Sequence, residues 1–240
     1  MKKHILAVLT LIVTLTFVIA PLLTDPFSGF RADQLPVPQI DPPVQPAGYA
    51  FSIWGVIYTW LMVSAVYGLL QRGDDPQWDR VRPALIISLL VGTPWLAIAN
   101  ANAILATILI FVMAASAIAA LWRTPTSDFW WLQAPVGLYA GWLTAASFVS
   151  LGSTAAGFGI VTDAIGWAYI GIIGALIVAM AVLIRTASLP YALAVVWALA
   201  GIIAANGLTT WTVSLLAAAG IFVLTGLAIM ARSTGQTVPS

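Results

Sequence analysis

Residues 83–122 read PALIISLLVGTPWLAIANANAILATILIFVMAASAIAALW, a stretch without a charged side chain. A helix needs about 20 apolar residues to cross the hydrocarbon core of a bilayer, so this stretch is long enough for two crossings. Asn100 and Asn102 lie near its middle and predict the turn between two helices. The stretch therefore predicts a pair of antiparallel membrane helices.

The composition of the whole chain also indicates a membrane protein. Of its 240 residues, 61% are hydrophobic and 7% are charged, whereas a soluble domain is about half apolar and a quarter charged. These proportions exclude a soluble enzyme, a nucleic-acid-binding protein and a disordered chain. The chain has no Cys, no Glu and one His, His4, which also excludes a thiolate nucleophile, a His-rich metal site and an intramembrane Ser-His-Asp triad. We therefore expect no enzymatic activity, no metal and no required cofactor.

Polar and turn-forming segments divide the chain into eight apolar runs, which predict an all-α polytopic membrane helix bundle. The expected spans are 4–23, 47–71, two within 83–122, 129–152, 164–184, and two within 186–231 that separate at Asn206-Gly207. A Pro-rich stretch (24–46), a charged hairpin (72–82) and a Gly/Ser/Thr loop (153–163) connect them. Asp163 is expected to cap the helix that follows it.

The distribution of positive charge predicts the orientation. If the N-terminus is cytoplasmic and the spans alternate, Arg31 alone among the nine Lys and Arg residues falls on the outer side. The cytoplasmic set is then Lys2, Lys3, Arg72, Arg80, Arg82, Arg123, Arg185 and Arg232. We expect an integral protein of the bacterial inner membrane with both termini in the cytoplasm. The first run is expected to be a retained helix, because no clean small-x-small cleavage site follows it.

Tryptophan is enriched, with 11 residues in the chain. An aromatic belt at the membrane surfaces explains Trp78, Trp122, Trp130, Trp131, Trp167 and Trp211. Counting 1.5 Å per residue places a second group near or above mid-membrane, in the outer halves of the second, third and fifth helices. This predicted ligand-binding group is Tyr49, Phe51, Trp54, Tyr58, Trp95, Asn100, Tyr139 and Trp142. Aromatic rings with a few neutral polar groups are typical of a pocket for an apolar ligand, and ordinary helix packing is the alternative.

Residues 46–58, PAGYAFSIWGVIY, resemble the start of the second helix in the TspO/MBR family of tryptophan-rich sensory or translocator proteins. In that family a Pro-rich loop leads into a helix with Trp and Tyr four residues apart, which is the spacing of Trp54 and Tyr58. Residues 93–95, Thr-Pro-Trp, and the aromatic segment 135–148 fit the same order. The chain is therefore similar to this family over its first 150 residues or so.

The resemblance implies a five-helix bundle over residues 1–152 with a ligand pocket under the first loop. An additional three-helix membrane segment, 153–232, and a polar tail, 233–240, would follow it. Family members are associated with tetrapyrroles such as protoporphyrin and with sterols, so a tetrapyrrole is a ligand that the resemblance allows. The family's usual loop Trp is replaced here by Gly48-Tyr49, which weakens the case for a porphyrin.

Two functions stay open at this point. The first is a membrane binding or sensory protein whose outer-half pocket holds a tetrapyrrole-, sterol- or isoprenoid-like ligand. The second is a transporter or permease for a small lipophilic or neutral solute. The expected partners are the lipid bilayer and the small apolar ligand, with a second copy of the chain in the case of a homodimer, and no nucleic acid.

Overall fold

The computed structural model describes residues 4–27 and 29–235, and within them the chain forms helices and no strand. The α-helices are α1 (Ile5–Ile19), α2 (Ile53–Gln71), α3 (Pro76–Gly92), α4 (Trp95–Ala101), α5 (Ala103–Leu121), α6 (Ala134–Gly157), α7 (Ala164–Thr186), α8 (Leu189–Asn206) and α9 (Trp211–Gly235). Short helical turns are η1 (Ala20–Leu23), η2 (Ala32–Gln34), η3 (Gly48–Ser52) and the π-helical η4 (Phe129–Gln133).

Eight helical segments in the described part are long and apolar enough to cross a membrane. Turns η1, η3 and η4 extend α1, α2 and α6, while α3 and α4 together make one span, Pro76–Ala101. The break between α3 and α4 falls at Thr93-Pro94, where the proline has no N–H to donate to the preceding turn. The predicted all-α polytopic membrane bundle with eight spans is confirmed.

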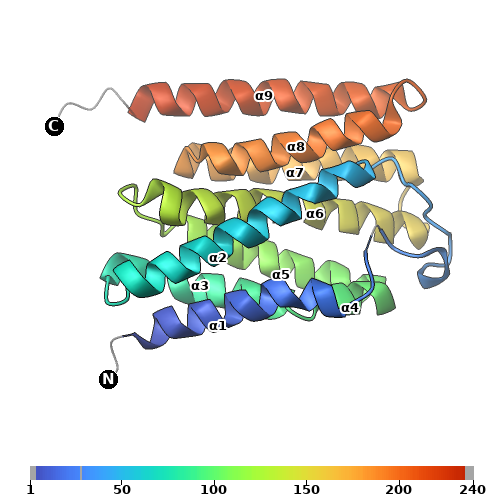
Figure 1. The fold of residues 1–240 in the computed structure, drawn as a ribbon. Helices are drawn as coiled ribbons and strands as arrows, with labels where there is room; N and C mark the ends of the chain where they lie inside the picture. The colour runs from blue at the N-terminus through green and yellow to red at the C-terminus, as the bar shows by residue number, and fades with distance from the viewer. Residues whose placement is uncertain (1–3, 28, 236–240) are drawn as a thin grey trace.

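The helices run side by side along one axis, and the chain reverses at two ends of the bundle (Figure 1). We call the end that holds residues 24–47 the loop end. The opposite end, with residues 72–75 and 122–128, is the charged end. Both the first and the last described residues lie at the charged end (Figure 1).

Side-chain caps set the starts of three helices. The carboxylate of Asp75 accepts a hydrogen bond from the Gln77 N–H at 2.8 Å, and Asn102 Oδ1 accepts one from the Leu105 N–H at 2.9 Å. Asp163 accepts from the Gly166 N–H at 2.8 Å, so its predicted role as the cap of α7 is confirmed. Each cap supplies an acceptor to a backbone N–H that has no partner inside its own helix.

The predicted loop 153–163 is wrong in its first half, because α6 continues to Gly157. Glycine, serine and threonine suggested a loop, but here they allow close packing. The Thr154 and Thr107 hydroxyls lie 2.8 Å apart across α6 and α5. A Cβ on Gly157 would lie 2.6 Å from Leu35 Cδ1, so only glycine admits this leucine against the last turn. Tertiary packing overrides the local composition.

The charged hairpin also differs from its prediction, since α3 begins inside it at Pro76. Asp75 caps that helix, and a proline in the first turn needs no N–H partner. Trp78 consequently lies on the inner face of α3 with 2% of its surface exposed. Its assignment to an aromatic belt is therefore wrong, whereas Trp122, Trp130, Trp131 and Trp211 are exposed as a belt requires.

Among the described residues, the larger of two hydrophobic clusters extends from Val13 of α1 to Ala228 of α9, and a smaller one joins Phe30 and Leu35 of the loop to α4 and α5. Helix α6 lies at the centre of the larger cluster and packs against α5, α7 and α8. Hydroxyl pairs join these helices, with Ser88 to Tyr139 at 3.0 Å and Thr144 to Tyr191 at 2.9 Å. The division of the chain at residue 152 stays a prediction. Helix α9 extends to Gly235, and both residues 236–240 of the predicted tail and Lys2-Lys3 lie outside the described residues.

Candidate ligand cavity at the loop end

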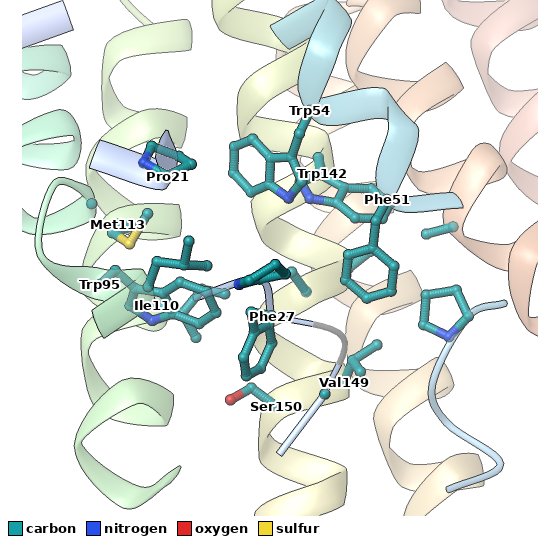
Figure 2. A pocket seen from close by; sticks show the side chains of 18 of the residues that line it. Pro21, Phe27, Phe51, Trp54, Trp95, Ile110, Met113, Trp142, Val149 and Ser150 are labelled. Carbon is teal, nitrogen blue, oxygen red and sulfur yellow. The ribbon is translucent and has the colours of Figure 1, made fainter. Parts of the chain in front are cut away.

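A cavity of about 330 Å³ lies inside the loop end (Figure 2). Its wall comes from α1 and η1, the loop, η3 and α2, the α3–α4 junction, α5, α6 and one residue of α8. The wall residues are Phe17, Ala20, Pro21, Pro26, Phe27, Gly29, Phe30, Gln45, Pro46, Phe51, Trp54, Tyr58, Gly92, Thr93, Trp95, Leu96, Ile110, Met113, Trp142, Ala145, Ala146, Val149, Ser150, Ser153 and Ala198. Its size and apolar wall are those of small-molecule sites.

Aromatic rings pack against one another on the α2 and α6 side of the cavity. The rings of Trp54 and Tyr58 are stacked with centroids 5.1 Å apart, as expected for residues four apart on one helix. Trp142 meets Trp54 edge to face at 6.3 Å and Phe51 at 5.9 Å. Figure 2 shows Phe51 of η3, Trp54 of α2 and Trp142 of α6 along one side of the cavity.

Trp95, Ile110 and Met113 line the opposite side, and Phe27 reaches toward Trp95 from the loop (Figure 2). The Phe27 and Trp95 rings lie edge to face at 5.4 Å. The indole N–H of Trp95 donates to the Ala106 carbonyl at 2.9 Å, which fixes this ring across the α4–α5 turn. The side chains on this side therefore present apolar surface to the interior of the cavity.

Four polar groups of the wall have no partner. Trp142 Nε1 is buried without a hydrogen bond, within the part of the chain that the structure describes. The Trp54 indole N–H and the hydroxyls of Tyr58 and Ser153 also form none with the described residues. Buried polar groups are normally paired, and among the described residues the buried side-chain atoms without a partner are Trp142 Nε1 in the cavity wall and Ser188 Oγ at the start of α8.

The loop over the cavity is held down on its α4 and α6 side by three hydrogen bonds. Gln34 Nε2 donates to the Ala99 carbonyl at 2.9 Å, and Asn100 Nδ2 donates to the Asp25 carbonyl at 2.9 Å. The Val37 N–H donates to the Gly157 carbonyl at 2.8 Å. These bonds place Pro26 and Phe27 over the cavity as part of its wall.

Helix α8 holds the other end of the loop. Asn206 Nδ2 donates to the Pro43 carbonyl at 2.8 Å, and the Ala47 N–H donates to the Gly201 carbonyl at 3.0 Å. Trp197 Nε1 donates to the Ala50 carbonyl at 2.8 Å. A helix beyond the predicted five-helix bundle therefore positions the start of α2, and its Ala198 lines the cavity.

Five of the eight side chains predicted as ligand-binding line this cavity, namely Phe51, Trp54, Tyr58, Trp95 and Trp142. The other three lie elsewhere. Tyr49 is 51% exposed and packs against Trp197. Asn100 anchors the loop, as described above. Tyr139 is fully buried beneath Phe17, with ring centroids 5.7 Å apart.

Sequence reasoning missed the contributions of α1, the loop and α8. Phe17 of α1 and Phe27 and Phe30 of the loop supply three further rings to the wall. The two loop phenylalanines carried a signal, because large apolar side chains in an otherwise polar connection have to be buried somewhere. Ala198 carried none, since a small apolar residue in an apolar helix is unremarkable.

The charged end uses its aromatic residues differently. Asp128 accepts hydrogen bonds from Arg72 Nε at 2.9 Å and from Trp78 Nε1 at 2.8 Å. The Arg72 guanidinium, opposed by partial burial and assisted by the Trp78 N–H, holds the pKa of the Asp128 carboxyl below its usual range. The buried guanidinium of Arg82 donates to the carbonyls of Gly68 at 2.9 Å and Arg72 at 2.8 Å and so closes the end of α2.

Among the described residues no group of three His, Cys, Asp or Glu side chains could hold a metal ion.

Comparison with known proteins gives one match. The family model described as "TSPO-like protein" matches residues 4–230, which include the first seven membrane spans and all but the last residue of the eighth, Trp211–Ala231. No curated protein and no solved structure matches the chain. The match agrees with the resemblance seen in residues 46–58 and extends through the last three helices. The chain is an integral membrane protein, and it belongs to the family of TSPO-like proteins.

Proposed function

We propose that this protein is a non-catalytic membrane receptor that binds a small apolar ligand in the cavity at the loop end. The observation that carries the proposal is the cavity itself, about 330 Å³ with two facing groups of aromatic side chains and unpaired polar atoms in its wall. A ligand that fills it would bury apolar surface at about 25 cal/mol per Å². Tetrapyrrole-, sterol- and isoprenoid-like molecules are the candidate ligands.

The chemistry of the wall supports binding over catalysis. Its described residues include no Asp, Lys, Arg or His. General acid–base chemistry near neutral pH draws mainly on these side chains, and serine acts as a nucleophile only beside a base. Ser150 is paired with Thr107 at 2.7 Å, and no base adjoins Ser153 in the described wall.

The packing beneath the cavity supports a binding protein over a permease. Phe17 contacts Tyr58 at 5.4 Å and Tyr139 at 5.7 Å between ring centroids, and these rings form a floor. The Tyr139 hydroxyl lies 3.0 Å from Ser88 Oγ, which in turn donates to the Met113 carbonyl at 2.8 Å. A solute moving from the cavity to the charged end would have to displace this closed layer, so transport is the second candidate.

The test is ligand binding measured by quenching of tryptophan fluorescence in purified protein. Protoporphyrin, a fluorescent sterol and a retinoid are suitable probes of the three ligand types. Trp142→Ala removes a central ring, and we expect it to weaken binding of the probe that binds best by about tenfold or more. Trp130→Ala is the matched control, because Trp130 is 65% exposed at the charged end. Equal affinities in the two variants would show that these ligands bind elsewhere.

We also propose that the loop end faces the outside of a bacterial inner membrane and that both termini are cytoplasmic. The distribution of Lys and Arg supports this orientation. Reporter fusions after residue 240 and between residues 158 and 163 should report opposite sides of the membrane. A cytoplasmic signal from both fusions would overturn the orientation and place the cavity differently.

A further inference from the structure

Trp122 and Arg185 form an exposed contact between the ends of α5 and α7. The guanidinium carbon of Arg185 lies 4.6 Å from the centre of the Trp122 ring. Both residues belong to the charged end, because Trp122 follows the last residue of α5 and because α8 returns the chain from α7 to the loop end at Asn206. The Trp122 side chain is 45% exposed, and Arg185 is exposed as well. The face of the indole attracts the guanidinium and holds this positive charge at the protein surface.

The carboxylates that the structure describes at the charged end contact other residues. Asp75 and Asp128 contact Arg72, Asp79 contacts Arg82, and Asp74 contacts His4. Arg185 forms neither an ion pair nor a hydrogen bond with the described residues. Arg123, directly after Trp122, donates to the Ala119 carbonyl of its own helix and also has no described carboxylate partner. Two positive charges without a counter-charge in the described protein therefore adjoin one exposed indole.

These residues lie where a membrane span meets the surface of the bilayer. The span of α5 ends at Leu121 and that of α7 at Thr186, so Trp122 and Arg185 are placed at the level of the lipid headgroups. A guanidinium donates up to two parallel hydrogen bonds to a phosphate, which makes a phosphate group its natural partner at this depth.

Exposed apolar surface continues from this contact toward the middle of the membrane. Ala181 precedes Arg185 by one helical turn and Ala115 precedes Trp122 by two turns, so each lies on the same face as the residue that it precedes. Both alanines are exposed and small. An acyl chain that hangs from a headgroup at Arg185 would lie against this surface. The adjoining apolar surface favours a lipid over a soluble phosphate.

We infer that Arg185, Arg123 and Trp122 form a binding site for the headgroup of an anionic phospholipid in the leaflet at the charged end. Arg185 and Arg123 contact the phosphate, and the Trp122 ring positions Arg185. Under the proposed orientation this is the cytoplasmic leaflet, whose surface is rich in anionic lipids. The site goes beyond the proposed function, because it lies at the opposite end of the bundle from the cavity and does not depend on a ligand there.

Native mass spectrometry of the detergent-solubilised protein tests the site by counting bound lipids. The probes are dioleoylphosphatidylglycerol, which is anionic, and dioleoylphosphatidylcholine, which has the same chains and no net charge. We expect the first phosphatidylglycerol to bind at least about fivefold more tightly than the first phosphatidylcholine. Arg185→Gln should weaken the binding of phosphatidylglycerol about fivefold and that of phosphatidylcholine less than about twofold.

Arg80→Gln is the matched control. Arg80 is an exposed arginine near the start of α3, also without a described carboxylate partner, but it contacts no aromatic ring of the described residues. Its replacement should change the affinity for phosphatidylglycerol less than about twofold. Trp122→Leu keeps both arginines and removes the ring, and it should weaken this binding about two- to threefold.

Three outcomes would overturn the inference. The first is equal binding of the two lipids to the wild-type protein, and the second is an equal loss of phosphatidylglycerol binding in Arg185→Gln and Arg80→Gln. The third is displacement of the lipid by a large molar excess of glycerol phosphate, which would identify a site for a soluble phosphate. Thermal unfolding of each variant in detergent verifies that a loss of binding does not come from a loss of fold.

Discussion

The two ends of the bundle contain the same kinds of aromatic side chain but differ in what their polar atoms contact. At the charged end, the indole of Trp78 donates to Asp128 and that of Trp60 donates to the Trp130 carbonyl. At the loop end, the indole nitrogens of Trp54 and Trp142 have no partner among the described residues. The indoles of Trp60 and Trp78 at the charged end are therefore fixed by hydrogen bonds, whereas those of Trp54 and Trp142 beside the cavity are held by ring contacts.

This difference separates a structural use of tryptophan from a binding use. Tyr67 and Trp131 stack with centroids 4.4 Å apart at the charged end, where the rings fill the space between them. At the loop end the rings surround a cavity of about 330 Å³. Of the two buried side-chain atoms without a partner among the described residues, Trp142 Nε1 lies in the wall of this cavity, and Ser188 Oγ lies at the start of α8.

The largest expected effect is the loss of Asp128. Asp128→Ala removes the shared acceptor of Arg72 and Trp78 and leaves the buried indole N–H of Trp78 without a partner. We expect the free energy of unfolding to fall by about 2–3 kcal/mol, since hydrogen bonds to a charged group are the strong ones. Thermal unfolding in detergent measures this, and ligand binding in the folded fraction should be unchanged.

Asp33→Ala is the matched control for this variant. Asp33 also pairs with an arginine, Arg31 at 3.1 Å, but its side chain is 70% exposed. An exposed ion pair contributes little, so this variant should unfold like the wild type. A similar loss in both variants would show that the buried position of Asp128 has no special role.

Acidification should weaken the contacts that Asp128 makes with Arg72 and Trp78. The Arg72 contact lowers the pKa of Asp128 in the folded protein, so its stabilising contribution is complete above the unfolded pKa of about 3.9. The contribution is lost as the pH falls through the lower, folded pKa. We expect thermal stability to decrease below about pH 4, and a smaller decrease in Asp128→Ala than in Asp33→Ala. An identical pH profile for these two variants would contradict this assignment.

A smaller effect is expected where α8 meets the start of α2. A methyl group on Gly201 would lie 2.8 Å from Pro46 Cβ and 2.9 Å from Ala50 Cβ, so the loop has to shift. Gly201→Ala should cost about 1–2 kcal/mol of stability through overpacking and should also weaken ligand binding, because Pro46 lines the cavity. Gly226→Ala in α9 is the control, since nothing lies within 4 Å of its added methyl group. Full ligand affinity in Gly201→Ala would mean that α8 does not shape the cavity.

The fold was predictable because the bilayer imposes simple rules on the sequence. Charge-free runs and turn pairs such as Asn206-Gly207 gave the eight spans, and α8 does end at Asn206. The extent of α6 was not predictable from composition, because residues 153–157 are helical only through their close contacts with α5 and the loop.

The candidate site was predictable only in part, for a geometric reason. Counting residues gives depth along a helix but not the direction in which a side chain points. Tyr139 and Trp142 lie on one helix at similar depth, yet only Trp142 lines the cavity. The role of α8 depends on contacts such as Trp197 with Ala50, which are 147 positions apart in the sequence.

The smallest expected effect tests the comparison of the two ends most directly. A substitution in the core usually lowers the free energy of unfolding, and here we expect that it does not. Trp142→Phe removes a buried N–H that has no acceptor among the described residues. We therefore expect the ligand-free protein to lose no stability. Removal of the unpaired donor should stabilise it by up to about 1 kcal/mol, reduced by the apolar burial that the smaller ring loses. Trp78→Phe removes a donor that Asp128 accepts at 2.8 Å and should destabilise by about 1.5–3 kcal/mol. Thermal unfolding of the two ligand-free variants compares an indole N–H that has no acceptor with one that is hydrogen-bonded. If both substitutions destabilise the protein equally, Trp142 has an acceptor in the folded protein after all, and the contrast between the two ends of the bundle fails.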